Sequence, residues 1–194
     1  MKTELVTDAT GTISSTSDVK AHLRVSTTDD DPYMLTLLKV ATDRVEEYTN
    51  RKLMTQTWYA YFDDWPDGNS IELPYAPLQS VGSTAIVYYD SNGSTTVMDS
   101  TKYVSDTVSE PGRVVLRNDC DWPTTSLYNS NPIRVEFTAG YGAASDVPDH
   151  YKQAALIWTA DMYEQRESFI VGQTVTGMPN SVESILFPKR LWSF

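Results

Sequence analysis

The chain has 194 residues, of which 40% are hydrophobic, and this is enough for one well-buried core or for two small lobes that share one. Its 15 Lys and Arg residues are outnumbered by 26 Asp and Glu residues, which gives a net charge of −11. That excess of acid argues against an electrostatic grip on nucleic acid or on an anionic membrane, because both need clustered basic side chains. It is compatible with DNA that passes along an acidic wall without being bound.

The cysteine count and the first residues restrict the protein class further. Cys120 is the only cysteine, so a disulfide or a thiolate metal cluster within one chain is excluded. Met1–Leu5 lack the apolar segment of a signal peptide, and no apolar run approaches the ~18 residues of a membrane span. We therefore expect a soluble protein that is not exported and that folds in a reducing cytoplasm.

The first fifty residues predict a polar arm and two helices. Residues 1–15 are rich in Ser and Thr and predict a loose N-terminal arm. Ser17 can cap a short helix over Asp18–Val25. After an acidic turn, Pro32 suits the first turn of a long amphipathic helix that stops at Asn50.

The middle of the chain changes character, because β-branched and aromatic residues dominate residues 54–140 and turn formers interrupt them. The Asn92-Gly93 pair predicts a type I′ hairpin turn, and residues 118–131 predict a long loop. The predicted strands are Gln56–Phe62, Ile71–Leu73, Thr84–Tyr89, Ser94–Met98, Tyr103–Asp106, Arg113–Arg117 and Ile133–Thr138.

A second long helix is predicted over Pro148–Glu167, followed by a Gly/Thr/Pro linker at 170–182 and an apolar end. The fold class is therefore α+β: two long helices and a short N-terminal helix packed together, an antiparallel β insert at about residues 54–140, and an extended C-terminal tail. The predicted organisation is an N-terminal arm (1–15), a helical lobe (16–53 and 143–169), the β insert (54–142), and a linker with a docking tail (170–194).

Residues that could carry chemistry are few. His22 and His150 are isolated from each other, and no metalloprotease, serine hydrolase or phosphate-loop motif occurs. Gly140-Tyr141-Gly142 lies between a strand and a helix, but Ser145 stands where a dinucleotide fingerprint needs its third glycine. We read it as a tight turn. We expect no enzyme activity, no cofactor and no metal.

Two further patterns allow a functional and a structural interpretation. The acidic clusters Asp29–Asp31 and Asp63-Asp64 could bind Ca²⁺, but the first precedes a helix, where acids are favourable, and the calcium-loop pattern is absent. Aromatic residues at strand spacing could stack on sugars, but such residues more often form core and cross-strand pairs. These aromatic residues are Trp58, Tyr59, Tyr61, Trp65, Tyr88 and Tyr89.

The C-terminal end concentrates apolar and basic residues after the predicted linker. Burying each large apolar side chain is worth roughly 1.5–3 kcal/mol, so the end either folds back on its own subunit or docks on a partner. Aromatic residues and Arg are common interface anchors, which favours docking. The candidate docking residues are Ile185, Leu186, Phe187, Lys189, Arg190, Leu191, Trp192 and Phe194.

A series of short segments keeps a fixed order over more than half of the chain. They are Asp18–Val25, Asp29–Asp31, Glu46–Leu53, Thr55–Trp58, Leu73–Val81, Glu110–Arg113, Trp122-Pro123, Val135–Gly142, Val147-Pro148 and Tyr163–Glu167. In this order they resemble the head–tail connector (adaptor, or head-completion) proteins of tailed bacteriophages. No single segment is specific, and the order carries the resemblance.

The resemblance implies a structural virion protein that assembles in the host cytoplasm and lies in the neck, at the head–tail interface. It implies a ring, expected to be a dodecamer, that sits under the portal protein, extends the DNA channel and meets the next neck or tail component. Genomic DNA would pass through without sequence-specific binding, and no membrane is involved. The C-terminal end commonly reaches toward the portal in such proteins, and Val182–Arg190 resembles that end.

Three other interpretations remain open at this point. The aromatic β region is compatible with a carbohydrate-binding or receptor-binding tail module. A hydrolase would need two acids across a cleft, and nothing in the sequence places Asp63 or Asp64 opposite a partner. Within the virion, a tail-completion protein or a neck stopper is an alternative to the adaptor next to the portal.

Overall fold

The computed structural model describes residues 1–165 and 178–192. The chain divides into two compact units. Met1–Ala9 and Thr55–Tyr141 form the β unit, and Thr10–Met54 with Gly142–Phe194 form the helical unit. The protein is α+β with antiparallel sheets, as the sequence predicts. No helix in the described parts of the chain is long and apolar enough to cross a membrane.

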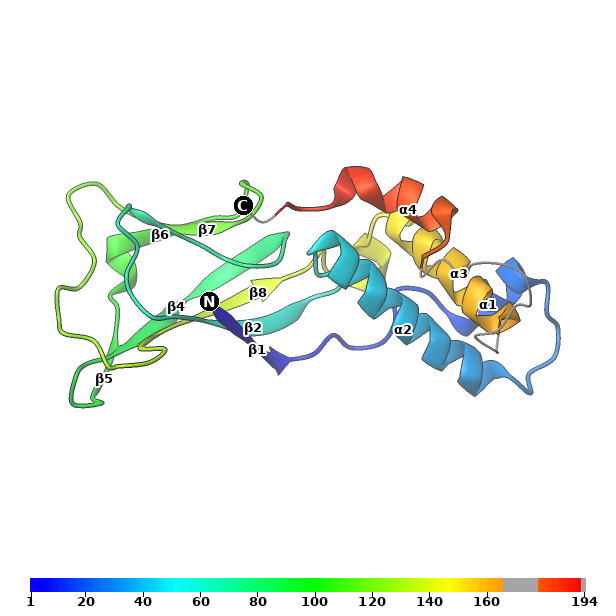
Figure 1. Cartoon of the computed structure of the whole chain (residues 1–194), viewed down its shortest axis with the longest axis horizontal. Coiled ribbons are helices and arrows are strands. Elements are labelled where there is room, and N and C mark those ends of the chain that lie inside the picture. Colours follow the sequence, from blue (N-terminus) through cyan, green and yellow to red (C-terminus); the bar gives the residue numbers. More distant parts are fainter. Residues whose placement is uncertain (166–177, 193–194) are drawn as a thin grey trace. The chain divides into compact units, whose positions relative to one another are not determined.

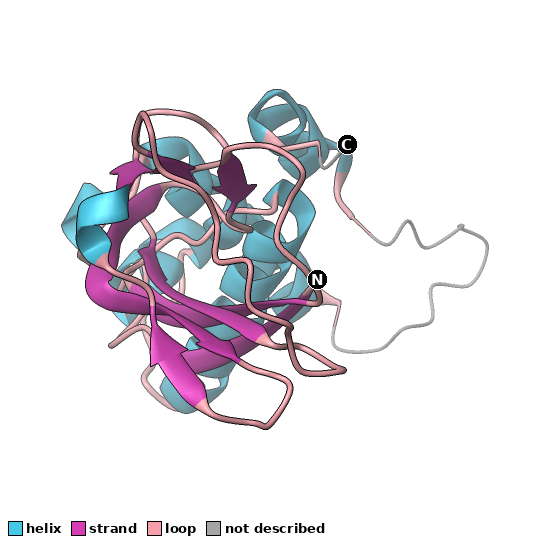
Figure 2. Ribbon diagram, turned by 90° about the vertical axis from the view of Figure 1, so that its left-hand side faces the viewer, coloured by secondary structure: helices cyan, strands magenta, loops and turns pink. Residues whose placement is uncertain are grey.

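The β unit contains two antiparallel sheets (Figures 1 and 2). The larger sheet has the order β1-β2-β8-β4-β5, and the smaller has the order β3-β7-β6. The strands are β1 (Lys2–Thr7), β2 (Gln56–Phe62), β3 (Ser70–Glu72), β4 (Leu78–Tyr89), β5 (Thr95–Val97), β6 (Tyr103–Asp106), β7 (Arg113–Leu116) and β8 (Ile133–Ala139), with a short 3-10 helix η1 (Ser100–Lys102) before β6.

Alternation along the strands builds the core of this unit. On β8, Ile133, Val135 and Phe137 are buried, while Arg134 and Glu136 point the other way. The aromatic residues follow the structural interpretation in part: Trp65 stacks on Trp122, with 5.0 Å between ring centroids, and both pack against the core. Tyr59 instead lies under the guanidinium of Arg134 at 4.4 Å.

The hairpin between β4 and β5 is present, but the predicted type I′ turn is wrong. The Gly93 N–H bonds the Asp90 carbonyl at 2.8 Å, and Gly93 (φ +82°) has positive φ whereas Asn92 does not. The Asp90 carboxylate also accepts the N–H groups of Asn92 and Ser94. This local bonding selects a three-residue loop with a single left-handed residue.

The prediction of a loose arm over residues 1–15 is wrong for its first part, because Lys2–Thr7 form β1 and pair with β2. Five of the six residues of β1 are exposed. An edge strand that is exposed on both faces needs no alternation of apolar and polar residues. The sequence of β1 therefore shows no strand pattern.

In the described residues of the helical unit there are four α-helices, and Figure 1 labels them. They are α1 (Thr16–Leu23), α2 (Asp31–Thr49), α3 (Asp149–Glu164) and α4 (Asn180–Leu186), with 3-10 helices η2 (Ala144–Asp146) and η3 (Phe187–Lys189). α2 packs against α3, and α1 and α4 contact both. On α3, the side chains of Tyr151, Ala155 and Trp158 lie in the core.

Helix ends agree with the sequence at α2 and differ elsewhere. Asn50 ends α2 in the left-handed region (φ +54°), as predicted. The cap of α1 is Ser15 and not Ser17, because Ser15 and Asp18 bond each other's main-chain N–H in a capping box. α3 ends at Glu164, and the rest of its predicted span, Arg166 and Glu167, lies outside the described residues.

The extended C-terminal tail is also wrong over Asn180–Lys189, which form α4 and η3. Val182 and Leu186, four residues apart, are both buried and hold α4 on the helical unit. Most of the predicted linker, residues 170–177, lies outside the described residues.

Candidate functional site

The last described residues lie along the C-terminal end of α2, within the helical unit. The Leu191 N–H bonds the Thr49 carbonyl at 3.0 Å, and the Asn50 side-chain amide donates to the Leu191 carbonyl at 2.9 Å. The Arg51 Nε–H donates to the Lys189 carbonyl at 2.8 Å. The last carbonyls of a helix have no hydrogen-bond donor within the helix. Here the Leu191 N–H of the tail bonds one of them, the Thr49 carbonyl. The tail is thus held on its own subunit by one bond between main-chain groups and by two bonds that side chains donate to its main-chain carbonyls.

These bonds position three side chains, the exposed Phe187 and Trp192 and the half-buried Arg190, which we call the tail face. The Arg190 guanidinium lies 4.6 Å from the Trp192 ring centroid and 5.2 Å from that of Tyr48. The Phe187 and Trp192 rings meet edge to face at 6.0 Å, and each residue is 53% exposed. Two half-exposed aromatic rings therefore lie at the surface, with the half-buried guanidinium of Arg190 packed against the Trp192 ring.

The eight predicted docking residues separate into distinct positions. Phe187, Lys189 and Trp192 are exposed, whereas Ile185, Arg190 and Leu191 are half-buried. Leu186 is fully buried in its own unit, which removes it from any docking surface. Phe194 lies outside the described residues.

Charge around the tail is positive in a chain that is acidic as a whole. Burial, and then the positive charges of Lys189 and Arg51, hold the pKa of His150 below its usual value, while Asp149 acts in the opposite direction. The neutral form of His150 is therefore favoured beside the tail. His22 lies apart from this group, on α1.

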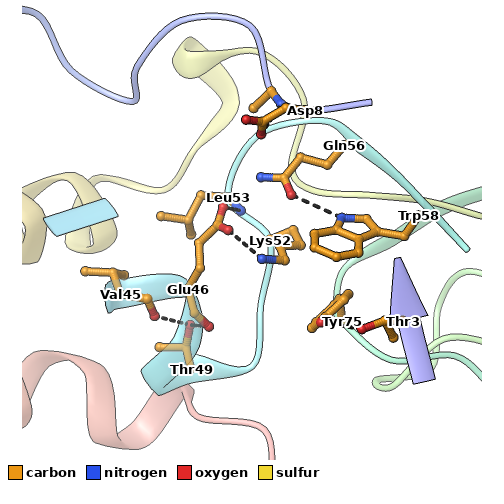
Figure 3. Close-up of polar contacts among 11 residues, drawn as sticks. Thr3, Asp8, Val45, Glu46, Thr49, Lys52, Leu53, Gln56, Trp58 and Tyr75 are labelled. Carbon is orange, nitrogen blue, oxygen red and sulfur yellow. Dashed lines mark hydrogen bonds and ion pairs between the residues drawn. The ribbon is translucent and has the colours of Figure 1, made fainter. Parts of the chain in front are cut away.

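The position of Arg51 depends on a buried acid that sequence reasoning missed. Glu46 is 5% exposed, and its carboxylate accepts the Lys52 ammonium and the Leu53 N–H, both at 2.8 Å. Figure 3 shows the Glu46 side chain reaching toward these two groups beside the bond from Thr49 to the Val45 carbonyl. The carboxylate fixes the chain as it leaves α2, so that Arg51 is directed at the tail. An acid on a long amphipathic helix gives no sequence signal for this role.

In the β unit, the loop between β6 and β7 is built around Asp106. Its carboxylate accepts the N–H groups of Val108 and Ser109 at 3.1 Å, the Ser109 hydroxyl at 2.7 Å and the Arg113 Nε–H at 2.9 Å. The Ser109 bonds, followed by Arg113, hold the pKa of Asp106 well below its usual range. Gly112 lies at the end of this loop, close to Leu78. A Cβ at position 112 would lie 2.3 Å from the Cβ of Leu78, so a larger residue does not fit there without a shift.

The neighbouring acids Asp63 and Asp64 both bond main-chain N–H groups. Asp63 accepts the Asn131 N–H at 3.0 Å, and Asp64 accepts the Trp65 N–H at 2.8 Å, so each carboxylate serves a turn of the main chain. Both line an open pocket of about 420 Å³ in the β unit, with Trp65 and Tyr128. Among the described residues, no group of three His, Cys, Asp or Glu side chains could hold a metal ion.

The Gly140-Tyr141-Gly142 segment is a tight turn, as predicted. Gly140 (φ +123°) and Gly142 (φ +135°) both lie in the region that other residues avoid. A Cβ on Gly142 would meet the Asp146 carboxylate, which accepts the Ala143 N–H at 2.8 Å.

Comparison with known structures shows that the fold is similar to that of chains from gene transfer agent particles. Three chains cover 100% of this chain and 97% of their own length. They come from the neck of an empty gene transfer agent particle computed with C6 symmetry (24% identity, TM-score 0.80), the virion of a native gene transfer agent particle (23%, 0.79), and the neck of the native particle computed with C12 symmetry (22%, 0.78). At this identity the likeness concerns the fold. No curated protein is significantly similar to the chain.

The sequence also matches a family model, described as phage gp6-like head–tail connector protein, over residues 14–111. The match spans about half of the chain and includes α1, α2 and the strands from β2 to β6. It confirms the resemblance drawn from the order of the short segments. The chain belongs to the phage gp6-like head–tail connector family and is a structural connector protein.

Proposed function

We propose that copies of this chain form a closed ring in the neck of a tailed-phage-like particle, under the portal protein. The ring extends the DNA channel and joins the head to the next neck or tail component. Family membership supports the connector role, and the C6 and C12 symmetry of the similar necks supports a ring. The net charge of −11 suits a conduit, because an acidic wall repels a phosphate backbone.

The observation that carries the proposal is the tail face, which we assign as the portal anchor. Phe187 and Trp192 are half exposed in the isolated chain although both are large and aromatic. Covering each is worth roughly 1.5–3 kcal/mol. Ile185 and Leu191, which are half-buried, and the exposed Lys189 lie in the same segment of the chain. A ring repeats this contact many times, so modest single contacts give a firm attachment.

The anchor is tested by adding purified subunits to DNA-filled heads that lack the protein. We expect the double variant Phe187→Ala with Trp192→Ala to fold normally, by circular dichroism, and to lose attachment to heads. The matched variant Phe187→Leu with Trp192→Phe keeps most of the apolar surface and should attach like the wild type. Attachment is measured by co-sedimentation with heads, and completed particles are counted by electron microscopy.

Wild-type attachment by the folded alanine variant would overturn the anchor assignment. The position of the ring is tested separately by imaging the completed necks. A chain found at the far end of the neck, away from the portal, would favour the alternative of a tail-completion protein or neck stopper.

A further inference from the structure

The N-terminal strand is attached to the β unit at one edge. β1 pairs with β2, from Lys2 opposite Tyr61 to Leu5 opposite Trp58, with a bulge before Thr7 (Figure 1). β1 is an end strand of the five-stranded sheet, and among residues 1–165 and 178–192 no strand pairs with its other edge. Leu5 and Val6 are each 42% exposed. Burial of apolar surface therefore contributes little to holding β1.

Side-chain bonds add two further attachments for β1. The Tyr61 hydroxyl donates to the Glu4 carboxylate at 2.7 Å, and burial together with this bond raises the pKa of Tyr61 to about 12. The hydroxyls of Thr3 and Tyr75 are hydrogen-bonded at 3.2 Å, and Figure 3 shows the two side chains next to each other. Main-chain pairing and these two bonds depend only on sequence and register, so any copy of β1 could supply them equally well.

The segment that follows β1 can take another path. Residues 8–12 join the strand to Ile13, which is 2% exposed and belongs to the helical core. Within this segment Gly11 has φ +92° and open space around it. The Ala9 N–H bonds the neighbouring Asp8, and the Thr12 hydroxyl bonds the Ser14 carbonyl, so both bonds are local. Five extended residues span at most about 17 Å, which limits β1 to its own unit or an adjacent copy.

We propose that β1 is an exchanged arm, so that in the ring Lys2–Thr7 of one copy pair with β2 of the next copy. The inference rests on the proposed ring, which brings identical β2 edges and identical arms together. Exchange keeps every bond described above and adds a link between subunits. The residues matched by the connector family model begin at residue 14, after the arm and its linker. Lys2 and Glu4 on the strand discourage indiscriminate pairing of the free edge.

Disulfide trapping distinguishes pairing within one chain from pairing between chains. In a Cys120→Ser background the chain has no other thiol. Two single-cysteine proteins, Glu4→Cys and Tyr59→Cys, place their thiols at positions that face each other in the β1–β2 register. They are mixed in equal amounts, assembled on heads that lack the protein, oxidised, denatured and run on a non-reducing gel.

Exchange predicts covalent dimers in the mixture, linked between the peptides that carry residues 4 and 59. The double variant, with both cysteines on one chain, should then give a ladder of covalent oligomers. A mixture of Glu4→Cys with Thr57→Cys, which is out of register, is the control and should give far fewer dimers. The subunit before assembly provides a second reference, since its strands can pair within one chain.

Complete rings that contain only monomers in the mixture, and only intrachain disulfides in the double variant, would overturn exchange while leaving the connector ring intact. Absence of any ring on the heads would instead overturn the proposed function, and exchange with it.

Discussion

Arg51 donates its Nε–H to the main-chain carbonyl of Lys189, 2.8 Å away, and so joins the end of α2 to a segment 138 residues further along the chain. Arg51 is 7% exposed, so solvent does not replace this bond easily. The position of the tail face depends on it, because Arg190 and Trp192 follow directly.

Replacing Arg51 with Ala should release the tail and destabilise the helical unit. A hydrogen bond to a charged group contributes about 1.5–3 kcal/mol, and we expect a loss of that order in the free energy of unfolding. The measurement is chemical denaturation, with solvent quenching of tryptophan fluorescence to follow Trp192. Arg117→Ala, at an exposed position, is the control and should change little. An unchanged unfolding midpoint for Arg51→Ala would contradict this role.

Replacing Ser15 with Ala should destabilise α1 by about 1 kcal/mol, because the capping box is lost. Ser17, which the sequence pattern favoured as the cap, lies exposed within α1. Ser17→Ala should be neutral or slightly stabilising, since Ala is the better helix former. Thermal unfolding of both variants decides between the two serines, and equal effects would argue against the Ser15 cap.

Replacing Gly112 with Ala should destabilise the β unit by roughly 1–3 kcal/mol, because the new methyl group would overlap the buried Leu78 side chain. Gly68→Ala is a matched control, as a Cβ there has no atom within 4 Å. Denaturant unfolding of the two variants gives the comparison. The idea of a closely packed loop fails if both glycines tolerate Ala equally.

The stability of the helical unit should fall as the pH drops below about 6.5, the pKa of His in an unfolded chain. Because the folded pKa of His150 is lowered, the unfolded state binds more protons in acid, and the free energy of unfolding decreases with falling pH. His150→Gln should flatten this dependence between about pH 7 and 5, whereas His22→Gln should leave it in place. Unfolding free energies measured at several pH values test the difference.

Sequence patterns predicted elements whose residues alternate or repeat regularly. β2 and β6 begin and end where their aromatic and β-branched runs do, and Asn50 stops α2 as expected. β1 was missed because an edge strand exposed on both faces carries no alternation. The hairpin turn was wrong because the side chain of Asp90, outside the Asn-Gly pair, sets the loop.

The tail was misread for a different reason. The apolar residues of the tail, taken together, indicate a docking segment. The four-residue spacing of Val182 and Leu186 instead indicates a helix with one buried face. Glu46 and Arg51 could not be found from local pattern at all. Their partners are a main-chain N–H beyond the helix end and a carbonyl near the C-terminus, and only the folded chain brings these together.

Because α4 and the three bonds at the end of α2 already hold residues 187–192, the two aromatic rings of the proposed anchor would meet the portal on a backbone that is fixed beforehand. The loss of conformational entropy takes place when each monomer folds, and docking then requires little further ordering of the chain. A docking surface that is ordered before binding favours fast and uniform attachment of many identical subunits. A disordered tail would have to become ordered during each binding event.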